Sequence, residues 1–220
     1  MTGLSRRSLL AFSVAAAATG MGVGIFPSRG EGAPVASDER LPVPALGEDG
    51  LYVQPWFLDS FLELSSDLAE TSAQGKRLAI MWEQRGCPYC RETHLVNLRQ
   101  PKVVDYITKH FNVIQMNLWG DREVVDFDGE KLSEKKLARK YGVQFTPTIM
   151  FFKDDPNGIG KLSPRDREVW RLLGYWKPFH FLNSFVYVSE KAYEKEPNFQ
   201  RWLQGVAEEM QRRGEPVNLW

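Results

Sequence analysis

The chain has only two cysteines, Cys87 and Cys90, and they stand three positions apart directly after a short apolar run. That run, Leu78 to Trp82, predicts a buried strand that ends in the loop Glu83-Gln84-Arg85-Gly86. Cys87 then begins a helix, with Pro88 in the first turn, where the N–H that proline lacks would have no partner anyway. The order strand, loop, cysteine pair and helix is the first structural prediction.

This cysteine pair is suited to thiol chemistry. Two cysteines are too few for a disulfide-stabilised scaffold, and they supply only half the ligands of a structural zinc site. At a helix start, free N–H groups and the positive end of the helix dipole favour a thiolate, so Cys87 is the predicted nucleophile. Cys90 lies one turn deeper, where desolvation disfavours its charged form, so it is predicted to resolve the mixed disulfide. The competing interpretation is a static disulfide or a chance pair.

The composition is that of a globular protein with one domain. The 220 residues are 43% apolar and 25% charged, which provides enough apolar surface for a packed core. The formal net charge is zero, and no run of lysine and arginine creates a local positive field. We therefore expect no nucleic acid partner.

The N-terminal segment has the pattern of an export signal. Arg6 and Arg7 precede a weakly hydrophobic stretch that is rich in alanine and glycine and ends at Pro27. It resembles a twin-arginine (Tat) signal, and Sec export or a membrane anchor are the alternatives. We expect the signal over residues 1–36, a flexible lead-in over 37–54 and a periplasmic location.

Helical and strand patterns continue on both sides of the cysteine pair. Phe57, Phe61, Leu64 and Leu68 recur at helical spacing and predict a first helix that ends at Gly75. Later patterns predict a helix over 103–111, a strand over 113–118 and a polar surface loop over 119–131. A helix capped by Ser133 and closed by Gly142 follows. The last predicted elements are a hairpin of strands 148–152 and 169–173 and two helices, one after Pro178 and one after Pro197. The predicted order is αβααβαββαα.

A second motif, Lys140-Tyr141-Gly142-Val143-Gln144-Phe145-Thr146-Pro147-Thr148, opens an apolar strand after the cysteine pair. Together the two motifs resemble those of thioredoxins, over roughly residues 57–188. The segment from Met81 to Cys90 and a tryptophan-bearing insertion look most similar to the exported SoxW-type thioredoxins of bacterial sulfur oxidation. The resemblance implies an α/β thioredoxin-like fold over residues 55–220, in which helices flank a central mixed sheet, with an extra C-terminal helix over 197–213.

The same resemblance implies how the site works. Pro147 would be cis and would face the disulfide. Thr146, whose backbone could pair with an extended substrate, is expected to contact the substrate together with Pro147, Pro88 and Tyr89; alternatively, Thr146-Pro147 is only the turn that enters the strand. The expected partners are cysteine-containing exported proteins, with a membrane thiol transporter as electron donor. We expect no cofactor and a monomer.

Two polar residues near the cysteines have alternative interpretations. Glu83 ends the buried strand, where it could relay a proton to Cys90, although a solvated carboxylate paired with Arg85 was the favoured reading of the sequence. His94 lies four residues after Cys90, so Cys87, Cys90 and His94 could bind copper or zinc, or His94 could simply complete a helix face.

Three functions are therefore compatible with the sequence. They are an exported disulfide reductase, a disulfide oxidase or isomerase, and a metal carrier without redox turnover. A group of tryptophans adds an undecided feature, because some of them are expected in the core and others in a substrate platform near the cysteines: Trp82, Trp119, Trp170 and Trp176.

Overall fold

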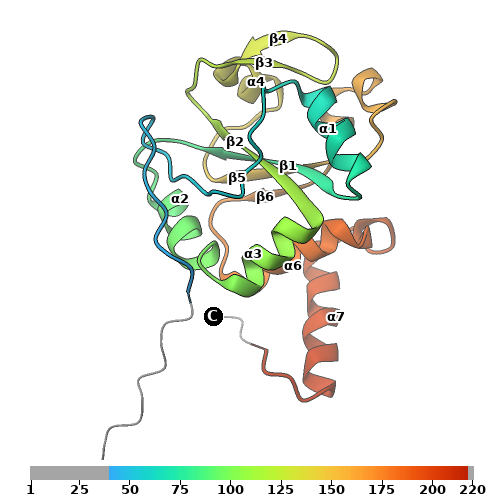
Figure 1. Cartoon of the computed structure of the whole chain (residues 1–220). Helices are drawn as coiled ribbons and strands as arrows, with labels where there is room; N and C mark the ends of the chain where they lie inside the picture. Colours follow the sequence, from blue (N-terminus) through green and yellow to red (C-terminus); the bar gives the residue numbers. More distant parts are fainter. Residues whose placement is uncertain (1–39, 218–220) are drawn as a thin grey trace, which may run out of the picture. The chain divides into compact units, whose positions relative to one another are not determined.

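The computed structural model describes residues 40–217, and their centre is a four-stranded mixed sheet (Figure 1). Strands β1 (Arg77–Glu83) and β2 (Phe111–Asn117) run parallel. Strand β5 (Thr148–Phe152) is antiparallel to β1, and β6 (Glu168–Leu173) is antiparallel to β5, which gives the order β2-β1-β5-β6. All seven residues of β1 are buried, which confirms the strand predicted before the cysteines.

The two faces of the sheet carry separate apolar clusters because successive strand residues point to opposite sides. On β1, Ile80 and Trp82 belong to one cluster, whereas Ala79 and Met81 belong to the other. Helices α1 (Leu64–Ala73) and α4 (Glu134–Lys140) cover the first face, and α3 (Pro101–His110) and α6 (Pro178–Ser189) cover the second (Figure 1). Each fully buried aliphatic or aromatic side chain contributes roughly 1.5–3 kcal/mol to this packing.

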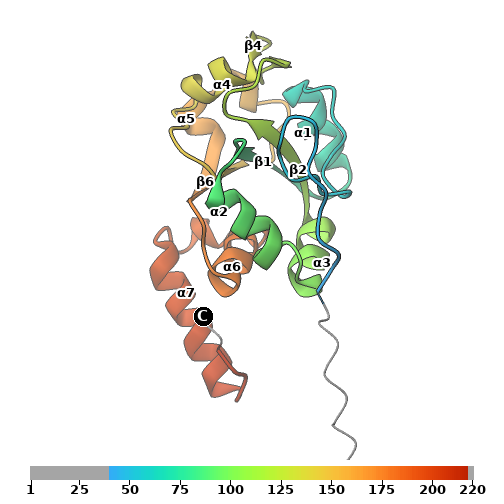
Figure 2. The ribbon, with the colours of Figure 1, turned by 90° about the vertical axis from the view of Figure 1, so that its left-hand side faces the viewer.

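Two helices complete the predicted order. Helix α2 (Pro88–Glu92) follows the cysteine loop and continues as a π-helical turn over Thr93–Asn97 (Figure 2). Helix α7 (Phe199–Arg212) buries Phe199 and Leu203 against the second cluster. The αβααβαββαα order is confirmed, and the structure adds short elements: β3 (Glu123–Val125), β4 (Lys131–Ser133), α5 (Pro164–Arg167) and single 3₁₀ turns at Ile159–Lys161 and Ala192–Glu194.

The first helix begins later than its apolar spacing predicts. Phe57 and Phe61 precede α1, and Phe61 is 98% exposed. The segment before α1 instead runs beside β2, where the Leu58 N–H donates to the Val113 carbonyl at 2.8 Å. Leu62 has a φ of 62°, which a right-handed helix cannot contain, so the helix starts only after it.

The segment predicted as a polar surface loop contains the β3–β4 hairpin, so that prediction was wrong. Val124 and Phe127 are buried in the first cluster, which supplies the packing energy that a polar loop would lack. Ser133 does occupy the N-cap position of α4, as predicted, but its hydroxyl makes no capping hydrogen bond and is buried without a partner among the described residues. Gly142 does end α4 with a φ of 63°, as predicted.

Part of the expected flexible lead-in has fixed contacts with the domain. Residues 40–54 lie against the cysteine helix and β2, and the Leu41 N–H donates to the Arg99 carbonyl at 2.7 Å. Leu51 is buried, and a bridge between Leu46 and Tyr52 closes a turn. The expected export signal lies outside the described residues. Within residues 40–217, the helices are all too short or too polar to cross a membrane.

Candidate active site

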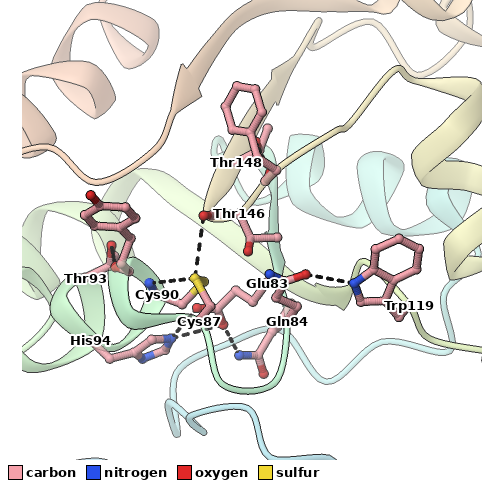
Figure 3. The surroundings of a disulfide bond; sticks show 12 residues. Glu83, Gln84, Cys87, Cys90, Thr93, His94, Trp119, Thr146 and Thr148 are labelled. Carbon is pink, nitrogen blue, oxygen red and sulfur yellow. Dashed lines mark hydrogen bonds and ion pairs between the residues drawn. A yellow bond between two sulfur atoms is a disulfide. The ribbon is translucent and has the colours of Figure 1, made fainter.

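The two cysteines form a disulfide at the start of α2 (Figure 3). Cys87 is the residue before the first helical turn, Pro88 occupies that turn, and the Cα atoms of the two cysteines are 5.3 Å apart. The backbone N–H of Cys90 donates to Cys87 Sγ at 3.0 Å. Cys87 is 8% exposed and Cys90 is 4% exposed. Cys87 is therefore the more exposed of the two cysteines, and its sulfur is the one that accepts a backbone hydrogen bond.

The Thr146–Pro147 segment lies directly against the disulfide. The Thr146–Pro147 peptide bond is cis, as the resemblance implied. The Thr146 carbonyl oxygen is 3.5 Å from Cys87 Sγ, so a protonated Cys87 thiol has an acceptor there (Figure 3). Pro88 and Tyr89 are exposed between the cysteines. All four residues predicted to contact substrate thus surround or border the cysteine pair.

Glu83 is buried, and its partner is not the one that the sequence favoured. The Glu83 carboxylate oxygens lie 2.9 and 3.0 Å from His94 Nε2, and both side chains are almost completely inaccessible. The side chain of Arg85 instead donates to the backbone carbonyls of Asp49 and Glu48. The reading of Glu83 as a solvated carboxylate paired with Arg85 was wrong, because the strand continues through Glu83 and turns its side chain under α2.

Two glutamines complete this buried cluster. Gln54 Nε2 lies 3.0 Å from His94 Nδ1, and the amide of Gln115 on β2 donates to Glu83. An amide N–H can only donate, so Nδ1 accepts, and the Nε2–H of a neutral imidazole then donates to the Glu83 carboxylate. The Tyr52 ring stacks on His94 with centroids 5.3 Å apart. Every polar atom of the His94 ring therefore has a partner.

The alternative metal site is not assembled. Both ring nitrogens of His94 are engaged, by Gln54 and by Glu83, which leaves neither nitrogen free to bind a metal ion beside the cysteines. Among the described residues, no group of three or more histidine, cysteine, aspartate and glutamate side chains is placed to hold a metal ion. In this oxidised state, Cys87, Cys90 and His94 are therefore not arranged as three ligands. Helical spacing alone could not reveal that a strand carboxylate would occupy the histidine.

A pocket of about 410 Å³ opens beside the disulfide. It is lined by both cysteines and Glu83 and, on the N-terminal side, by Leu51 and Tyr52. Glu83 and Cys90 therefore line the same pocket. Sequence reasoning missed Tyr52, Gln54 and Gln115, and their positions in a polar lead-in and on a strand gave no signal of this contact.

The structure divides the tryptophans between two roles. Trp82 is fully buried, and Trp170 and Trp176 pack with Phe199 beneath α6 and α7. Trp119 is different, because it is exposed and its indole N–H donates to Gln84 Oε1 at 2.8 Å (Figure 3). It is therefore attached to the loop that leads to Cys87.

Comparisons with solved structures find thioredoxin folds. A thioredoxin-fold protein from Helicobacter pylori shares 22% identity, with coverage of 62% of this chain and 85% of that one and a TM-score of 0.46. A thioredoxin from Thermus thermophilus shares 22% identity, with coverage of 57% and 83% and a TM-score of 0.42. The oxidised C-terminal domain of DsbD from Neisseria meningitidis shares 16% identity, with coverage of 56% and 90% and a TM-score of 0.38. No curated protein sequence matches the chain.

The family assignment comes from a different comparison. The family model described as "Thioredoxin-like domain" matches residues 64–188, which is more than half of the chain. The matched region begins at α1 and ends in α6, and it contains the cysteine pair, the cis-proline segment and the whole four-stranded sheet. This chain belongs to the thioredoxin-like domain family.

Proposed function

We propose that this protein is an exported thiol:disulfide oxidoreductase that reduces disulfides in cysteine-bearing exported proteins. One observation carries the proposal: Cys87 Sγ sits at the start of α2, accepts the Cys90 N–H, and lies 3.5 Å from the Thr146 carbonyl. The backbone donor and the helix dipole favour a thiolate at Cys87 once the disulfide is reduced. A static structural disulfide would not need a donor directed at one of its sulfurs.

The reaction is a two-step exchange. The Cys87 thiolate attacks one sulfur of the substrate disulfide, so that a bond to Cys87 forms, the substrate bond breaks, and one substrate thiolate leaves. Cys90 then loses its proton and attacks Cys87 Sγ, which releases the second substrate thiolate and closes the Cys87–Cys90 disulfide. Two electrons pass to the substrate. The one proton that Cys90 loses protonates one of the two released thiolates, and the other takes its proton from solvent.

Glu83 is the proposed acceptor for the Cys90 proton. It lines the same pocket as Cys90, and its side chain is buried. It precedes Cys87 by four positions. The hydrogen bond from His94 Nε2 holds the carboxylate in place. A base in a buried position can act on the resolving thiol only if it shares a cavity with it, since proton transfer needs direct or single-water contact.

The finer assignment concerns the cellular setting. We propose a periplasmic protein of the SoxW type, which acts on partners in bacterial sulfur oxidation and receives electrons from a membrane thiol transporter. The resemblance of the segment from Met81 to Cys90 and the twin-arginine pattern at Arg6 and Arg7 support this assignment. Thr146, with Pro147, Pro88 and Tyr89, would contact the substrate chain beside the disulfide.

Substitution of each cysteine tests the proposal. Because the resolving thiol releases the product, Cys90→Ala should accumulate mixed disulfides with partner proteins, whereas Cys87→Ala should accumulate few or none. The adducts are visible as dithiothreitol-sensitive bands on non-reducing gels of periplasmic extract, and mass spectrometry identifies the partner. Equal trapping by both variants would overturn the assigned roles. Absence of adducts together with no insulin reduction by the wild type would overturn the proposed function.

The reduction potential of the pair determines the direction of exchange. A reductase is expected near the ~−270 mV of thioredoxin, whereas a strong oxidase lies near ~−120 mV. Equilibration with glutathione buffers, followed by alkylation of free thiols, measures this value. A potential close to that of the strong oxidases would replace the reductase with the oxidase.

A further inference from the structure

We propose that Trp119 is a docking residue for polypeptide substrates, which packs against apolar side chains next to the substrate cysteine. The inference rests on the proposed function, because it names a residue that would recognise the protein substrates of the cysteine pair. Trp119 lies outside the sheet and helices that form the core, in the connection between β2 and β3. Its role must therefore come from what it presents at the surface.

Three large exposed side chains border the disulfide, and we call them the aromatic rim: Trp119, Tyr89 and Phe145. They are 63%, 59% and 49% exposed, respectively. Tyr89 lies between the cysteines, and Phe145 precedes Thr146, whose carbonyl contacts Cys87 Sγ. Exposed aromatic side chains that gather around a reactive group mark a surface that binds a partner.

Trp119 is held in its exposed position. Its indole N–H donates to Gln84 Oε1 at 2.8 Å, and its backbone N–H donates to Asn117 Oδ1 at 3.0 Å. The Gln84 carbonyl in turn accepts the Cys87 N–H at 3.3 Å. Figure 3 shows Trp119 beside Gln84, on the opposite side of Cys87 from His94. The indole is thus linked through one residue to the nucleophile.

The turn after Trp119 is also fixed. A Cβ added at Gly120 would meet Glu134 Oε2 at 1.9 Å, so the backbone here packs directly on a carboxylate. That carboxylate is buried and accepts hydrogen bonds from the Asn117 N–H at 2.8 Å and from Arg122 at 2.6 Å. A surface that is ordered before binding avoids the entropy cost of ordering on binding. An exposed side chain with no binding role would not need this support.

The geometry favours a polypeptide over a small disulfide as the partner. The pocket beside the disulfide has the size of a small-molecule site, yet its lining includes none of the aromatic rim. A small disulfide can therefore approach the cysteines without contact with Trp119. A polypeptide, whose backbone continues on both sides of its cysteine, must cross the rim.

Substitution of Trp119 separates these two approaches. Trp119→Ala should lower the ratio of kcat/KM for insulin to kcat/KM for bis(2-hydroxyethyl) disulfide by about tenfold, the effect of removing a well-packed aromatic interface residue. The decrease should arise from a higher KM for insulin. Trp119→Phe, which keeps an aromatic surface, should restore most of the ratio. Phe61→Ala is the matched control, because Phe61 is also an exposed aromatic side chain, 98% exposed before α1.

The outcomes distinguish this inference from the proposed function. If the wild type reduces insulin and Trp119→Ala keeps the wild-type ratio, Trp119 does not dock the substrate. If Phe61→Ala lowers the ratio as much as Trp119→Ala, the effect is not specific to the rim, and the inference is overturned. If the wild type reduces neither disulfide, the proposed function itself fails. Retained activity on the small disulfide shows that each variant is folded.

Discussion

Glu83→Gln is the substitution that most directly tests the chemistry beneath the cysteine pair. The variant removes the proton acceptor and keeps the size of the side chain. The glutamine carbonyl can still accept the His94 Nε2–H, which now lies 2.9 Å from the carboxylate. Gln115 has to turn its own amide, because it donates to the other carboxylate oxygen. The fold is expected to survive, and thermal unfolding monitored by circular dichroism checks this.

The size of the effect follows from thiol ionisation. An ordinary cysteine thiol with a pKa of about 8.5 is roughly 3% ionised at pH 7 and roughly 75% ionised at pH 9. Without a base, the second step at pH 7 must depend on that small fraction, so it should slow by about 30-fold, within the ten- to hundredfold range of general-base removal. At pH 9 the deficit should shrink, because a larger fraction of the thiol then ionises without a base.

A single-turnover experiment isolates the second step. Reduced protein is mixed with bis(2-hydroxyethyl) disulfide, quenched in acid and alkylated, and mass spectrometry counts the adduct on Cys87. Glu83→Gln should accumulate this adduct at pH 7 and lose it at pH 9. Asp67→Asn is the control, because it neutralises another buried carboxylate, on α1, bonded to Ser60. An unchanged rate and pH profile in Glu83→Gln would make Glu83 a structural residue only.

Three further predictions concern stability and export. Arg167→Met should lower the free energy of unfolding by about 1–3 kcal/mol in urea denaturation, because the buried Asp126 loses its guanidinium partner at 2.9 Å while Lys140 and the Tyr141 hydroxyl still contact it; a loss below about 0.5 kcal/mol would contradict this. Burial alone would raise the pKa of Asp128, but hydrogen bonds from Lys140 and Arg167 outweigh it and hold the pKa well below its usual range. A carboxyl whose pKa is lowered in the folded state stabilises the fold above the unfolded pKa of about 3.9, and this stabilisation is lost as the pH falls. Asp128→Asn should therefore make the free energy of unfolding depend less on pH in the acid range, and an unchanged dependence would refute the prediction. Replacing Arg6 and Arg7 by lysine should leave precursor in the cytoplasm, and undiminished periplasmic protein would exclude the twin-arginine route.

The central fold could be predicted because its signals are local. The apolar run at 78–82, the proline after Cys87 and the glycine at 142 each specify a strand, a helix start or a helix end without help from distant residues. The start of α1 was misplaced because helical spacing continued through Phe57 and Phe61. A backbone contact to β2 and the left-handed conformation of Leu62 override that spacing.

The surroundings of the disulfide depend on contacts between distant segments, so they could not be predicted in the same way. His94 was placed correctly on the cysteine helix, but its function depends on which groups bury it. Gln54 lies 40 positions before it and Glu83 lies 11 positions before it. The sequence likewise contains no signal for the position of Trp119, because its hydrogen bond to Gln84 joins residues that are 35 positions apart. The Asp128-Gly129 pair, which is frequent in hairpin turns, was the available signal for the β3–β4 hairpin.

The cluster around His94 also shows that the functional unit is larger than the matched family region. Tyr52 and Gln54 precede residue 64, where the family match begins, yet they cover and bond the histidine that holds Glu83. Without them, His94 Nδ1 would lose its donor and a buried polar atom would be left unpaired, at a cost of about 1–3 kcal/mol. The carboxylate would then sit beside an imidazole that is free to turn or to bind water. The segment before α1 therefore belongs to the surroundings of the cysteine pair, because it supplies the hydrogen-bond partner of His94 Nδ1.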